Sequence, residues 1–87
     1  MLIEEDKELA HILSPYWTEE EAGEYYDYFN HGEDFLATFW AAVLLDKYEI
    51  TVSPRLFEYI TNVGMDERDL DSKLYKRMQR RQQNADG

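Results

Sequence analysis

Three carboxylates between residues 18 and 34 have a spacing that places them on one side of a helix. Glu20, Glu24 and Asp27 follow one another at intervals of four and three residues. An α-helix would align them with about one turn, roughly 5–6 Å, between neighbours. This separation resembles the spacing of phosphates along a nucleic acid strand. The pattern therefore suits a cationic groove that normally holds a nucleic acid backbone.

Tyrosines and further acids surround these carboxylates. Tyrosine is a rigid amphipathic side chain that is common at the energetic centre of protein interfaces. The competing interpretation is a solvated acidic face, with Tyr25 and Tyr26 in the core or at its boundary. We predict a partner-binding surface made of Glu20, Glu24, Tyr25, Asp27, Tyr28, Glu33 and Asp34.

Residues that usually perform catalysis or hold metals are sparse in this chain. The histidines His11 and His31 form no metalloprotease motif, and there is neither a cysteine nor a glycine-rich phosphate loop. Asp69 and Asp71 begin like a calcium-binding loop, but its fifth position would be Lys73. We therefore predict a non-enzymatic protein with no cofactor and no metal, and we expect His31 to interact with a helix C-terminus.

The charge of the chain is divided unevenly between its halves. Residues 1–50 hold 13 of the 19 acidic groups and have a net charge of −11, whereas residues 51–87 have a net charge of +1. Such a field attracts cationic partners and repels nucleic acid. The acidic N-terminus is unlike a secretion signal, and the apolar stretch 35–45 is shorter than the roughly 20 residues of a membrane span. We expect a cytoplasmic protein that binds neither nucleic acid nor membrane directly.

Helix start and stop signals divide the chain into helical segments. Thr18 and Glu21 have the spacing of a capping box, and Ser53 followed by Pro54 is a helix-start signal. Asp34 and Asp66 are expected to cap two further helices. The predicted helices cover about 4–13, 18–30, 34–48, 53–64 and 66–81.

Three glycines add to this division. Gly32 suits the left-handed conformation that ends a helix, and Gly64 is expected to cap the end of the fourth segment. Gly23 lies inside the second segment, where glycine costs up to about 1 kcal/mol relative to alanine. We interpret Gly23 as a mark of close packing.

The segment from about 34 to 48 is the predicted centre of the fold. Residues 35–45 are apolar on every side, and such a helix is usually buried on every side. We therefore predict an all-α fold, a small bundle of four to five short helices around this buried central helix. Residues 1–81 would form a single domain, and residues 82–87 a flexible C-terminal tail.

The last predicted helix is the basic counterpart of the acidic segment. Its bases could complement the helix dipole, bind phosphates, or pair with the acidic face of the same or a second chain. They are Lys73, Lys76, Arg77, Arg80 and Arg81.

These features favour one function and leave alternatives open. In overall character, though not in any motif, the chain resembles inhibitors that phages and toxin systems direct against nucleic-acid enzymes, such as anti-CRISPR, antirestriction and nuclease-immunity proteins. The leading hypothesis is a nucleic-acid mimic that binds the basic surface of a nucleic-acid-binding protein. The alternatives are a homodimeric module that shares the central helix between subunits, and a regulatory subunit or transcription-associated adaptor that uses the basic helix.

Overall fold

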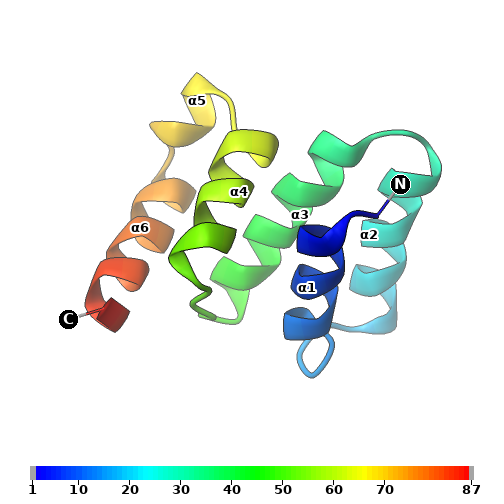
Figure 1. Ribbon diagram of the computed structural model, residues 1–87, viewed down its shortest axis with the longest axis horizontal. Coiled ribbons are helices and arrows are strands. Elements are labelled where there is room, and N and C mark those ends of the chain that lie inside the picture. Colours follow the sequence, from blue (N-terminus) through cyan, green and yellow to red (C-terminus); the bar gives the residue numbers. More distant parts are fainter. Residues whose placement is uncertain (1, 87) are drawn as a thin grey trace.

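The computed structural model describes residues 2–86, apart from the side chain of Asp86, and this part of the chain is all-helical (Figure 1). The all-α prediction is therefore confirmed. The predicted fifth helix is divided into a single turn and a longer helix, because the chain bends between Leu70 and Lys73. The helices are α1 (Glu4–Leu13), α2 (Glu19–Asn30), α3 (Asp34–Lys47), α4 (Pro54–Gly64), α5 (Glu67–Leu70) and α6 (Lys73–Asp86).

Local hydrogen bonds explain where α2 and α4 begin. The Thr18 hydroxyl accepts from the Glu21 N–H at 3.1 Å, and the Glu21 carboxylate accepts from the Thr18 N–H at 2.9 Å. The Ser53 hydroxyl caps α4, whose first residue is Pro54. Because these side chains satisfy backbone donors that the helix leaves unpaired, the predicted start signals are confirmed.

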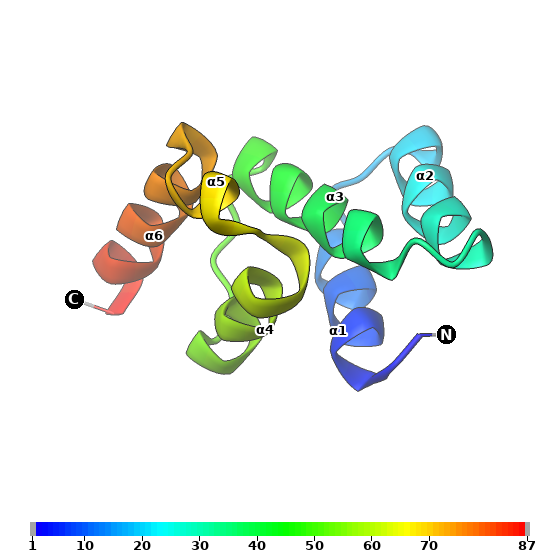
Figure 2. The same ribbon diagram turned by 90° about the horizontal axis from the view of Figure 1, so that it is seen from above.

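The helix α3 is the centre of the fold, as predicted. The helices α1, α2, α4 and α6 each pack against it, and it runs between them (Figure 2). Its first turn differs from the prediction, because Phe35 and Leu36 are exposed where the chain has just reversed at Gly32. One chain is sufficient to bury the six core positions of α3, which are Ala37, Thr38, Ala41, Ala42, Leu44 and Leu45.

Two helical glycines have opposite environments. A Cβ at Gly64 would lie 2.9 Å from the backbone nitrogen of Phe39 and 2.9 Å from a side-chain carbon of Thr38. Gly64 is the last residue of α4. Because it has no Cβ, it lets that helix approach α3 closely. At Gly23 a Cβ would meet nothing within 4 Å, so our interpretation of Gly23 as a close-packing site was wrong.

Glu21 joins α2 to α3. Its carboxylate accepts from the Lys47 ammonium at 2.6 Å and the Tyr48 hydroxyl at 2.5 Å, and its carbonyl accepts from the Trp40 indole at 3.0 Å. The Lys47 and Tyr48 donors stabilise the ionised form, which lowers the pKa of Glu21 to about 2. Glu21 is therefore a structural acid at the inner side of α2.

Asp46 joins α3 to α6. Arg77 and Arg81 contact its carboxylate at 2.8 Å and 3.2 Å, and these guanidinium groups hold the pKa of Asp46 below its ordinary value. Gln82 completes the attachment, because its side-chain amide bonds both the N–H and the carbonyl of Val52, at 2.8 Å and 2.7 Å. The helix runs on through Asp86, so residues 82–86 of the predicted tail are helical, and Gly87 lies outside the described residues.

Candidate protein-binding surface

The outer face of α2 carries the three carboxylates that were predicted from their spacing to lie on one side of a helix. Glu20, Glu24 and Asp27 are all exposed, and their intervals of four and three residues align them along the helix. We call these three residues the acidic stripe. The helix lies at one end of the molecule, and α6 lies at the other (Figure 1). The stripe is therefore an exposed surface on the helix that lies at the opposite end of the molecule from α6.

Tyr28 supports the stripe from beside it. Its side chain is partly buried, and its hydroxyl donates to the Glu24 carboxylate at 3.0 Å. This hydrogen bond to the carboxylate raises the pKa of Tyr28 above its ordinary value. Tyr28 thus orients the Glu24 carboxylate on the exposed face.

Tyr25 belongs to the core and is removed from the predicted binding residues. It is fully buried and belongs to the hydrophobic core. Its hydroxyl donates to the Asp6 carbonyl at 2.9 Å, and its ring lies 5.6 Å from that of Trp17 and 5.0 Å from that of Phe29. Of the two interpretations of this residue, the core interpretation is the one the structure supports.

Glu33 and Asp34 lie in the turn that follows α2, and both are exposed. Glu33 is the N-cap of α3 and Asp34 is its first residue, so the predicted cap at Asp34 is shifted by one position. The Glu33 N–H donates to the Tyr28 carbonyl at 2.7 Å, which holds this turn against the end of α2. The turn thus adds two carboxylates beyond the C-terminal end of that helix.

Ion pairs within the described residues leave the acidic stripe uncompensated. Among the described residues, four of the nine bases pair with acids elsewhere, and none of these pairs includes a residue of the stripe. These four bases therefore connect helices instead of neutralising the exposed face of α2. The pairs are Lys47 with Glu21, Arg55 with Glu5 and Glu8, and Arg77 and Arg81 with Asp46.

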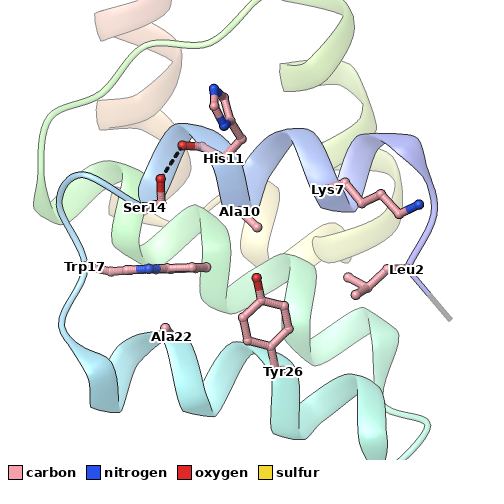
Figure 3. A pocket seen from close by; sticks show the side chains of 8 residues that line it. All are labelled: Leu2, Lys7, Ala10, His11, Ser14, Trp17, Ala22 and Tyr26. Carbon is pink, nitrogen blue, oxygen red and sulfur yellow. Dashed lines mark hydrogen bonds between the residues drawn. The ribbon is translucent and has the colours of Figure 1, made fainter.

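A groove between α1 and α2 was not predicted from the sequence. It is open to solvent, has a volume of about 440 Å³ and lies between the two helices (Figure 3). Tyr26, for which the sequence offered the core or its boundary, is 40% exposed at this groove. We call this site the α1–α2 groove, and the lining residues used below are Leu2, Lys7, Ala10, Trp17, Ala22 and Tyr26.

The chemistry that this end of the molecule offers is recognition by charge and by aromatic contact. Within residues 2–85, no three carboxylate or imidazole side chains are grouped so that they could hold a metal ion. The His31 ring nitrogen Nδ1 lies 2.7 Å from the Asp27 carbonyl, at the C-terminal end of α2. This contact confirms the predicted interaction of His31 with a helix terminus.

Comparisons with known proteins returned no match to any protein-family model, curated protein or solved structure. None of the described helices is long and apolar enough to cross a membrane.

Proposed function

We propose that this protein is a non-enzymatic inhibitor or regulator that binds the basic, nucleic-acid-binding surface of another protein. The observation that carries this proposal is the acidic stripe, whose three exposed carboxylates have no basic partner among the described residues. Like charges at these helical intervals repel one another. A cationic partner would relieve this repulsion and would match a row of charges about one turn apart.

The net charge of −10 extends the same argument to the whole molecule. A negative field speeds encounter with cationic surfaces and opposes contact with nucleic acid. A partner whose groove normally accepts phosphates would meet carboxylates at similar intervals. The protein would then compete with nucleic acid for that groove.

A capture experiment tests this proposal. The tagged protein is incubated with an extract of the organism that encodes it, and bound proteins are identified by mass spectrometry at low and high salt. We expect a nucleic-acid-binding protein at low salt only, because exposed charge pairs are screened at high salt. Added duplex DNA or RNA should displace that protein.

Matched variants make the test specific to the stripe. E20Q/E24Q/D27N removes three charges from it and preserves an acceptor for Tyr28, whereas E49Q/E58Q/E67Q removes three exposed charges elsewhere. We expect the first variant to bind about 10-fold more weakly and the second to bind like the wild type. Equal capture by both variants, or no capture of a nucleic-acid-binding protein, would overturn the proposal.

A further inference from the structure

We infer that the α1–α2 groove and the acidic stripe form one composite surface for a basic protein segment that carries an apolar anchor residue. The inference rests on the proposed function and adds the chemistry of the partner's contact segment. Its apolar side chain would enter the groove, and its arginines or lysines would reach the stripe across the exposed surface of α2.

The groove offers apolar surface that an incoming side chain could cover. Its cavity of about 440 Å³ lies within the range of about 300–1,000 Å³ that is usual for ligand sites. Ala10 and Ala22 contribute small side chains from the two helices, Trp17 closes one end, and Leu2 lies toward the other (Figure 3). An aromatic or branched aliphatic side chain would fill this space and bury both its own apolar surface and that of the groove.

Tyr26 presents an exposed ring that is supported from below. Its ring lies 6.0 Å from that of Trp17 at 70° and 5.5 Å from that of Tyr25 at 75°. Tyr25 in turn is fixed by its hydrogen bond to Asp6. A partly exposed aromatic side chain that packed rings already hold in place loses little freedom on binding. Trp and Tyr are also the residue types most enriched at interface hot spots.

Gly23 connects the groove to the stripe. It follows Glu20 by three residues and precedes Tyr26 and Asp27 by three and four residues, so it lies between them on the helix surface. It has no positive φ, and a Cβ there would meet nothing within 4 Å. Neither the backbone nor the packing of this chain requires glycine at position 23. Because glycine has no side chain, the partner's backbone could approach α2 closely between the groove and the stripe.

The charges around the groove fix the orientation of its occupant. Lys7 lines the α1 side of the groove. Around the circumference of α2, Gly23 lies between the groove and the acidic stripe. His11, on the same side as Lys7, directs its ring away from α2 (Figure 3). A cationic group would be repelled by Lys7 and attracted by the stripe. The apolar residue therefore enters the groove, and the basic residues extend over α2.

The experiment uses two synthetic peptides and NMR titration. The probes are acetyl-RRFRR-amide and acetyl-RRSRR-amide, which have equal charge and differ in the anchor. We expect the Phe peptide to bind about 10-fold more tightly than the Ser peptide. Its addition should shift the Trp17 indole and Gly23 amide signals. Equal affinity of the two peptides, or shifts confined to other regions, would overturn the inference.

Variants separate the groove from the stripe. Ala10→Phe should fill the groove and abolish the advantage of the Phe peptide, whereas Ala85→Phe, an exposed site on α6, should preserve it. E20Q/E24Q/D27N should weaken both peptides by a similar factor. If charge-dependent capture persists but the advantage of the Phe peptide is absent, the groove inference fails and the proposed function stands. Circular dichroism verifies the fold of each variant.

Gly23→Ala gives a second readout that does not depend on filling the groove. The added methyl group should raise the melting temperature, because alanine is the better helix former. It should also weaken the Phe peptide several-fold, because the partner's backbone loses its close approach. A variant that melts higher and binds the Phe peptide like the wild type would contradict the role of Gly23.

Discussion

The two ends of this molecule use charge in different ways. At the α6 end, Arg77 and Arg81 point inward to Asp46 and hold the helix to α3. At the α2 end, one inward acid, Glu21, performs the corresponding task through Lys47. The remaining acids of α2 are exposed, and this helix lies at the opposite end of the molecule from α6 (Figure 2).

This difference shows which charges the fold requires. Each end helix is attached to α3 through one acid whose pKa is lowered by its donors, Glu21 for α2 and Asp46 for α6. The carboxylates of the acidic stripe make no such connection among the described residues. Structural acids and exposed acids therefore respond differently to mutation, to pH and to salt.

The largest expected effect is the loosening of α6 by Asp46→Ala. The variant removes the carboxylate that two arginines share, and it should lower the free energy of unfolding by about 2 kcal/mol, a value reduced by the partial exposure of Arg77. Hydrogen exchange should show the loss of protection concentrated in α6. Arg80→Gln, an exposed site on the same helix, is the matched control and should change stability by less than about 0.5 kcal/mol. An equal loss of protection in α2 and α6 would contradict the separate attachment of the two ends.

The sequence contained the signals for the elements of this fold. Short-range patterns such as Thr18 with Glu21, or Ser53 before Pro54, predict helix starts because their hydrogen bonds are local. The apolar run at 35–45 predicted the central helix for a similar reason, since an apolar composition favours burial, although Phe35 and Leu36 at its start are exposed.

The partners of individual side chains were beyond such patterns. Glu21 was recognised as a capping residue, but its contacts with Lys47 and Tyr48 join residues 26 and 27 positions apart. Tyr25 and Tyr26 are adjacent and chemically identical, yet one is buried and the other is exposed. The sequence left open whether each lies in the core or at its boundary, because helical periodicity gives a direction around the helix without showing where neighbouring helices end. The groove at Tyr26 depends on the separation of α1 and α2, which only the packed structure gives.

An effect of intermediate size is expected when the pH is lowered, and it tests the contribution of the Glu21 carboxylate to stability. The pKa of Glu21 in the folded protein is about 2, below its ordinary value of 4.5. Its ionised form therefore stabilises the fold fully above about pH 4.5, and this contribution is lost as the pH falls toward 2. Glu21→Gln should lower the free energy of unfolding by about 1–1.5 kcal/mol at neutral pH. Urea unfolding from neutral pH to about pH 2.5 should then show a smaller acid loss in the variant.

Glu20→Gln is the control for this titration. Glu20 is the neighbouring residue, but it is exposed and belongs to the acidic stripe. Its variant should retain the acid-dependent loss of the wild type. If Glu20→Gln flattened the pH profile as strongly as Glu21→Gln, the distinction between structural and exposed acids on α2 would fail.

The smallest expected effect has the opposite sign. E24Q/D27N should raise the free energy of unfolding by about 0.5 kcal/mol at low salt, because Glu24 and Asp27 are like charges three residues apart and Asp27 lies near the negative end of the helix dipole. The glutamine oxygen can still accept from Tyr28. At about 1 M salt, where the Debye length is roughly 3 Å, the gain should largely disappear in thermal or urea melts. A loss of stability instead would mean that these acids serve the fold. A gain in stability, combined with weaker capture of a basic partner by the stripe variant, would mean that the exposed acids of α2 serve binding at a cost to stability. The acids that attach the helices to α3 would then differ from them, because those acids serve the fold.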